Sequence, residues 1–96
     1  MSYSYRDISE IIKSQKTFLK KKYGLEKIGI FNHYPDANSV DFVAEFNSAM
    51  GMQFIDFCEF IESMLNIDAQ VITIEGLENI KDETLKNGIK SKAEYV

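Results

Sequence analysis

The sequence contains few of the residues that staple or interrupt small folds. Its 96 residues include one cysteine, one proline, one histidine and no tryptophan. A single cysteine cannot form an internal disulfide, and the lone His33 has no second histidine or cysteine nearby with which to bind zinc. Hydrophobic runs are only a few residues long, whereas a membrane-spanning helix needs about 20. The first ten residues lack the basic and apolar pattern of a secretory signal, so we expect a cytoplasmic location.

The residues that are present are typical of one folded domain. Hydrophobic residues make up 45% of the chain and charged residues 27%, which argues against disorder and allows a small core. We therefore expect a single domain over residues 1–96. The net charge is −4, with 15 acidic and 11 basic residues, so neither nucleic acid nor an anionic membrane is an expected partner. The cations Lys20–Lys22 are expected at a helix C-terminus, where they stabilise the helix dipole. The alternative is a basic surface that meets a phosphate or an acidic partner.

Hydrophobic spacing predicts three helices and three strands. Apolar residues recur at i, i+3 and i+4 in the helices, whereas the strands are short alternating or continuous apolar runs. Gly24 and Gly88 are expected to end the first and last helices, and the tail after Gly88 is ambiguous. The result is an α/β fold of the α+β type, a small mixed sheet flanked by helices. The expected order is α-β-β-α-β-α, over residues 7–23, 26–31, 40–46, 52–65, 69–74 and 80–87.

Four phrases in the sequence carry a resemblance to a known family. In chain order they are LKKKYGLEKIGIFNHY, SVDFVAEF, EFIESMLNIDAQVITIEGL and KDETLKNGI. Their order, spacing and flanking hydrophobic residues resemble the minimal nucleotidyltransferases of the DNA polymerase beta superfamily, of the type found in toxin–antitoxin pairs. The resemblance covers roughly residues 9–90. It implies a minimal nucleotidyltransferase-like fold.

The resemblance also implies where an active site would lie. The family transfers a nucleoside monophosphate with two Mg²⁺ ions, held about 3.5–4 Å apart by carboxylates on neighbouring strands. A Gly-Ser turn follows its first strand, an Asp-x-Asp lies on the second, and another Asp lies on the third. The Gly-Ser positions correspond to Asn32 and His33. The Asp-x-Asp positions correspond to Ser39 and Asp41, and the last Asp corresponds to Gln70.

Only Asp41 retains the residue that the family uses at its position. One carboxylate remains where three would hold two metal ions, so we expect no cofactor, and Asp41 is a weak metal candidate at most. The connection between His33 and Ser39 is also shorter than is usual in the family. A relocated carboxylate could come from Asp68, which shares a strand face with Gln70, whereas Glu45 lies too far along its strand. Mg²⁺ and ATP would be needed only in that case.

The helix expected over residues 52–65 is apolar around more than half of its circumference. Ile55 and Phe60 lie on the two flanks of its core-facing stripe. A helix of this kind is either deeply buried or in contact with another chain. Both interpretations remain open, and Ile55 and Phe60 are the candidate interface residues.

The residues and the resemblance together favour a catalytically degenerate nucleotidyltransferase-fold protein. It would bind another protein or itself, for example as the antitoxin-like half of a pair with a small helical toxin. One alternative is an active Mg²⁺-dependent nucleotidyltransferase that uses Asp41 with relocated carboxylates. The other is an unrelated small α/β interaction module. The family fold requires Asn32, Ser39, Asp41 and Gln70 to meet in one cleft, and scattered positions would leave only the last alternative.

Overall fold

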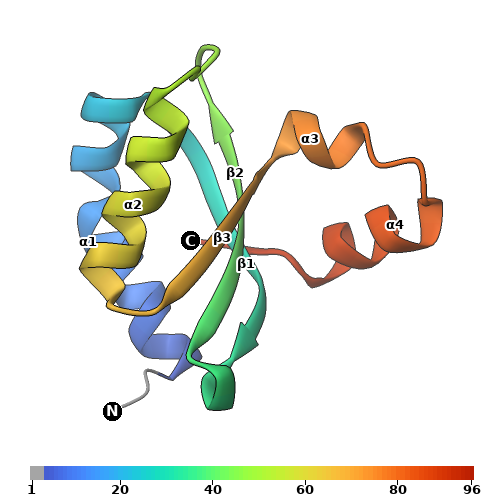
Figure 1. Ribbon diagram of the computed structural model, residues 1–96, viewed down its shortest axis with the longest axis horizontal. Coiled ribbons are helices and arrows are strands. Elements are labelled where there is room, and N and C mark those ends of the chain that lie inside the picture. Colours follow the sequence, from blue (N-terminus) through green and yellow to red (C-terminus); the bar gives the residue numbers. More distant parts are fainter. Residues whose placement is uncertain (1–3) are drawn as a thin grey trace.

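One four-stranded sheet organises the chain, and the computed structural model describes residues 4–96 of it (Figure 1). The strands lie in the order β3-β2-β1-β4. In chain order the elements are α1 (Tyr5–Tyr23), β1 (Leu25–Tyr34), the 3-10 turn η1 (Pro35–Ala37), β2 (Ser39–Phe46), α2 (Gln53–Leu65), β3 (Asp68–Thr73), α3 (Ile74–Glu78), α4 (Glu83–Lys92) and β4 (Glu94–Tyr95).

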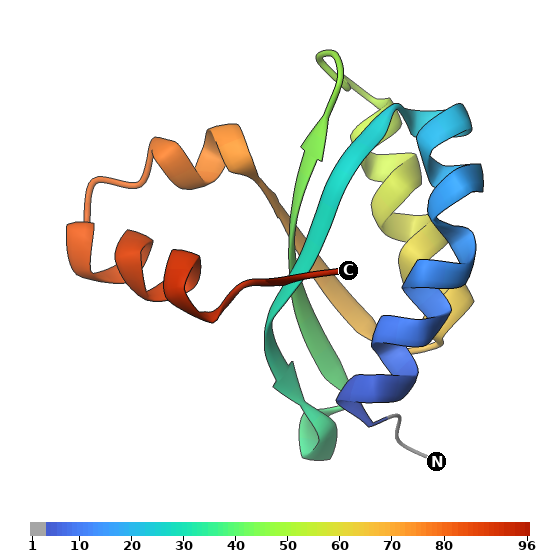
Figure 2. The same cartoon turned by 180° about the vertical axis from the view of Figure 1, so that it is seen from behind.

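The sheet is mixed, with helices on both of its faces. β1 pairs antiparallel with β2 and β4, whereas β2 and β3 are parallel and joined through α2. α1 and α2 lie side by side over one face, and α3 and α4 lie on the other side (Figures 1 and 2). This arrangement confirms the expected α+β fold with a small mixed sheet flanked by helices.

The first helix ends at Tyr23 as expected, but it begins at Tyr5, two residues before the expected start at residue 7. Ser4 caps it, because its hydroxyl accepts a hydrogen bond from the Asp7 amide while the Asp7 carboxylate accepts one from the Ser4 amide, each at 3.1 Å. Gly24 ends the helix in the left-handed region, with φ at 72°. A Cβ atom at Gly24 would collide with the Asn47 side chain. The Asn47 amide also donates to the Gly24 carbonyl at 2.8 Å, which ties this turn to the end of β2.

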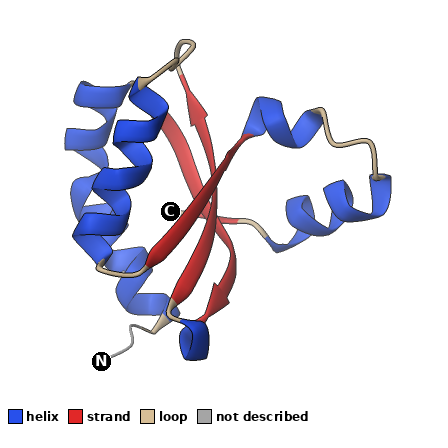
Figure 3. Cartoon of the chain, viewed as in Figure 1, coloured by secondary structure: helices blue, strands red, loops and turns tan. Residues whose placement is uncertain are grey.

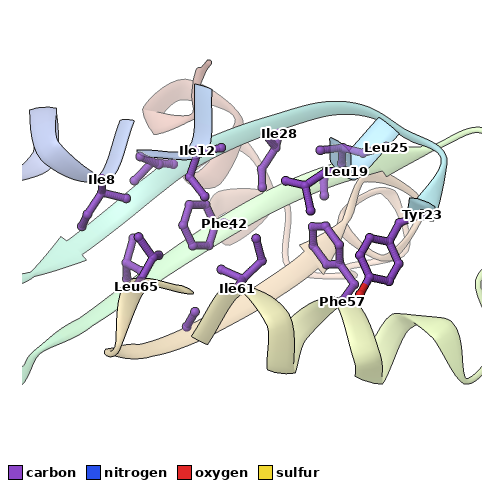
Figure 4. Close-up of a cluster of buried hydrophobic side chains, with 14 of the residues drawn as sticks. Ile8, Ile12, Leu19, Tyr23, Leu25, Ile28, Phe42, Phe57, Ile61 and Leu65 are labelled. Atoms are coloured by element: carbon purple, nitrogen blue, oxygen red, sulfur yellow. The ribbon is translucent and has the colours of Figure 1, made fainter. Parts of the chain in front are cut away.

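The main hydrophobic core lies between the sheet and the α1–α2 layer (Figure 4). Its largest fully buried side chains are Phe42 of β2 and Phe57 of α2. A smaller cluster on the opposite face joins Val43 to Leu77 of α3 and Ile89 of α4. The sheet therefore buries apolar side chains on both faces, which explains the nearly continuous apolar run of β2. Within residues 4–96 no helix has the length and apolar character needed to span a bilayer.

Several expectations about the elements were wrong in detail (Figure 3). The last helix starts at Glu83 rather than residue 80, because Asp82 caps it by accepting from the Leu85 amide at 3.2 Å. Gly88 lies inside that helix and does not end it. The ambiguous tail forms β4, and a short helix, α3, follows β3 directly. The chain therefore contains more helices and strands than the six that were expected.

Two positions on α2 test how burial controls stability. Phe57 is fully buried and Ile55 is 55% exposed. We expect Phe57→Ala to lower the free energy of unfolding by about 3–5 kcal/mol, because it leaves a cavity in the core. The matched Ile55→Ala change should stay within about 0.5 kcal/mol of wild type. Urea denaturation of both variants measures the difference, and equal losses would show that this face of α2 is assigned wrongly.

Candidate functional site

Three of the five positions that the resemblance assigns to an active site form one row across the sheet. Asn32 on β1 is paired with Asp41 on β2, and Asp41 is paired with Gln70 on β3. Residues directly opposite one another on neighbouring strands point to the same face. The Asn32 amide nitrogen lies 3.5 Å from an Asp41 carboxylate oxygen, a long hydrogen bond. The fold therefore brings these three polar side chains together on the α3–α4 side of the sheet.

A bulge in β1 turns Asn32 towards this row. Ile30 pairs with Phe42 and Asn32 pairs with Asp41, so Phe31 is an extra residue between two consecutive pairs. Ile30 is buried in the main core, whereas Phe31 packs against the smaller cluster on the opposite face. Without the bulge, regular alternation would place Asn32 on the same face as Ile30.

The polar row lies in a cleft of about 590 Å³ between the sheet and α4. The row and Thr84 of α4 form the polar part of this cleft, and Lys92 adds a cation to its lining. Leu85, which is 54% exposed, also lines the cleft from α4. The apolar lining comes from the sheet and the helix, through Phe31, Val71, Ile72, Leu85 and Ile89.

The other two positions that the resemblance assigns to an active site, Ser39 and His33, lie outside this cleft. Ser39 shares a sheet face with Asp41 but lies one row further along, between Tyr34 and Asp68 on the neighbouring strands. His33 was expected in a turn but lies on β1 opposite Val40. It lines a smaller hollow at the edge of the sheet, which adjoins the cleft and shares Phe31, Asn32 and Lys92 with it. The structure therefore unites Asn32, Asp41 and Gln70, places Ser39 beside them and separates His33.

The residues of the cleft do not fit a pair of magnesium ions. Asp41 brings one carboxylate, and Asn32 and Gln70 bring neutral amides, so one negative charge would face two dications. Across residues 4–96 no three histidine, cysteine or acidic side chains lie close enough to hold a metal ion together. Asp68 pairs with Ser39 rather than Asp41, and this shift of two residues along a strand is about 6.6 Å.

Hydrogen bonds between α1 and the β4 segment fix the edge of the site. The Tyr5 hydroxyl of α1 donates to a Glu94 carboxylate oxygen of β4 at 2.9 Å. Desolvation of the hydroxyl, followed by the hydrogen bond and the charge of Glu94, raises the pKa of Tyr5 to about 12. Tyr5 is therefore a protonated donor throughout the neutral range. The Lys16 ammonium also donates to the main-chain oxygen of Val96 at 2.7 Å, so β4 holds the end of α4 beside the cleft.

The two candidate interface residues occupy different environments. Phe60 packs against α1, with ring centroids 5.3 Å from Phe18 and 6.3 Å from Tyr23, and is partly buried. Ile55 is exposed and lies one helical turn from Met52, which is 82% exposed. Phe60 thus helps to fill the seam between α1 and α2, and Ile55 faces solvent. Their role in an interface stays a prediction.

The α4 residues of the cleft were not identified from the sequence. Leu85 and Lys92 line it, but the helix was expected to end before Gly88, which left Lys92 in an ambiguous tail. The usable signal was Asp82, an N-cap residue followed by Glu83. A helix that starts at this cap presents Leu85 and Ile89 at i, i+4 spacing, and that spacing indicates that the helix continues past Gly88.

Comparison with known proteins supports a nucleotidyltransferase-like relationship. The chain matches no protein-family model. It is similar to a protein of Methanocaldococcus jannaschii named "Putative protein adenylyltransferase". The two are 26% identical over 81 residues, which span 76% of this chain and 81% of that protein. The similarity therefore extends over most of both sequences.

Restoring the missing carboxylates tests the correspondence of these positions. We expect Ser39→Asp combined with Gln70→Asp to lower the melting temperature in chelator, because the two new carboxylates join Asp41 and Asp68 on one sheet face and repel them. Mg²⁺ or Mn²⁺ should raise it again by binding the folded state. The control pair, Ser48→Asp with Gln53→Asp, makes the same changes at exposed positions. If metal leaves the melting temperatures of the wild type, the double variant and the control unchanged, the correspondence of Ser39 and Gln70 with the aspartates of the family is contradicted.

Proposed function

We propose that this chain is a catalytically inactive nucleotidyltransferase-like protein that acts by binding another protein. The observation that carries the proposal is the row Asn32–Asp41–Gln70, in which a single carboxylate stands between two carboxamides. The cleft contains three of the positions that the resemblance assigns to a nucleotidyltransferase site, but it lacks the charge that two metal ions require.

Without these metal ions the cleft is poorly suited to a nucleoside triphosphate. Asp41 would repel the phosphates, and Lys92 is the cation among the residues that line the cleft. The neutral amides of Asn32 and Gln70 can donate hydrogen bonds, but they cannot offset several phosphate charges. Binding of ATP is therefore expected to be weak, and transfer of AMP is expected to be absent.

The apolar lining of the cleft suits contact with an apolar segment of another protein. Phe31, Ile72 and Leu85 line one cleft, and Leu85 is half exposed. A helix that presents one apolar stripe could place a side chain against Leu85. A small helical toxin-like protein is the partner that we propose, with this chain in the antitoxin-like role. That choice of partner is an analogy with the nucleotidyltransferase/helical-toxin pairs.

The inactive assignment is tested by binding and by transfer. We expect isothermal titration with ATP and Mg²⁺ to give a dissociation constant no tighter than about 1 mM, since no carboxylate set holds the metal. Labelled ATP should transfer no AMP to this chain or to a mixture of helical proteins. The Ser39→Asp, Gln70→Asp variant serves as the comparison. Micromolar, Mg²⁺-dependent binding by wild type would favour the active alternative.

The partner assignment is tested at the cleft. If the neighbouring gene encodes a small helical protein, we expect the two proteins to co-purify. Leu85→Asp should weaken the complex at least tenfold, because a charge is then desolvated in the contact. Asn87→Asp, a change to the same residue at an exposed position of α4, should leave binding unchanged. Equal binding by all three proteins would place the partner elsewhere.

A further inference from the structure

The two helices on one side of the sheet carry opposite charge. α1 contains six cations (Arg6, Lys13, Lys16, Lys20, Lys21 and Lys22) and two acidic residues (Asp7 and Glu10). α2 contains three acidic residues (Asp56, Glu59 and Glu62) and no cation. Asp7 and Glu10 both lie in the first two turns of α1, so the second half of the helix is entirely basic. One layer of the molecule therefore has a basic half and an acidic half.

These opposite charges do not neutralise one another within the chain. Of the three ion pairs among the described residues, one lies within α1, one within α4 and one between α3 and α4. None joins α1 to α2. The same layer exposes large apolar side chains that include Phe18 of α1, Met52 before α2 and Ile55 of α2. The outer surface of the layer is thus available for contact with another molecule.

The layer is self-complementary because α1 and α2 run antiparallel. The C-terminal end of α1 lies beside the N-terminal end of α2 (Figures 1 and 2). Suppose that a second copy is related by a two-fold axis parallel to the helices. The rotation exchanges the two sides of the layer, so each α1 then faces the α2 of the other copy. It keeps the position along the helices, so Lys20 and Lys21 of one copy come opposite Asp56 and Glu59 of the other.

We propose that this face is the interface of a symmetric dimer of the chain. Its contacts are two identical α1–α2 pairings with opposite charges, and Phe18, Met52 and Ile55 lie among them. The occupant is a second copy, because its charge pattern matches this face in both halves. The proposal rests on the helical layer and not on the cleft, so it can fail without affecting the proposed function, and the reverse is also true.

The size of the face limits the strength of the dimer. α1 has 19 residues and α2 has 13, which correspond to about 28 Å and 20 Å of helix. Two helices, each about 10 Å wide, present about 400–550 Å² per copy. This is below the roughly 800 Å² per partner of a standard interface. We therefore expect a weak dimer that forms at high protein concentration and dissociates as salt screens the charges.

Charge reversal gives a direct test of the pairing. One variant carries Lys20→Glu and Lys21→Glu in α1, and a second carries Asp56→Lys and Glu59→Lys in α2. Each alone places like charges opposite each other in both pairings, so we expect dimerisation to weaken at least tenfold. An equimolar mixture restores opposite charges in both pairings and should form a heterodimer. Sedimentation velocity at low salt measures all three samples.

Matched controls separate this pairing from the effect of net charge. Lys27→Glu with Lys81→Glu, and Glu26→Lys with Asp36→Lys, make the same changes of net charge at exposed positions outside the layer. Neither the controls nor their mixture should behave like the layer variants. The wild type alone provides a second test if a variant fails to fold, because its dimer should dissociate when salt rises. A wild type that stays monomeric at low salt, or controls that weaken the dimer equally, would overturn the proposal.

Discussion

The register of β1, β2 and β3 is the constraint on which the candidate site depends. Pairing of Asn32 with Asp41 and of Asp41 with Gln70 turns three residues that are far apart in the sequence into one row. The bulge at Phe31 is essential to that row, because a regular strand would place Asn32 on the face of the main core. It also places the Phe31 side chain against the smaller cluster that supports α4. The extra residue Phe31 therefore places the Asn32 side chain in the polar row and its own ring in the apolar lining of the cleft.

The sequence allowed the layers of the fold to be predicted because its hydrophobic periods are clear. α1 and α2 each bury one apolar stripe, and the run from Val40 to Phe46 matches a strand covered on both faces. The positions of Asn32, Asp41 and Gln70 followed from the resemblance, and the structure brings these three together. Ser39 was expected in the same cleft and lies just outside it.

Other features could not be predicted because they depend on contacts between distant parts of the chain. β4 pairs over only two residues, Gly29 and Ile30, and is held by Tyr5 and Lys16, contacts that no local pattern indicates. β1 was expected to end before Asn32, because Pro35 and the neighbouring polar residues are typical of a turn. The strand continues to residue 34 because β2 supplies hydrogen-bonding partners along its whole length.

The side chains of the Asn32–Asp41–Gln70 row also bear on whether the stability of the sheet depends on a bound metal ion. Three carboxylates on adjacent strands would repel one another, so a site built from them gains stability when a cation binds. Asn32 and Gln70 flank Asp41 with neutral groups, and Asn32 donates a long hydrogen bond to it, so the sheet contains no such repulsion. We therefore expect the strands to keep their register without a metal ion. Leu85 at the cleft and the charged α1–α2 layer would then be presented without any ligand, as the proposed binding of another protein or a second copy requires.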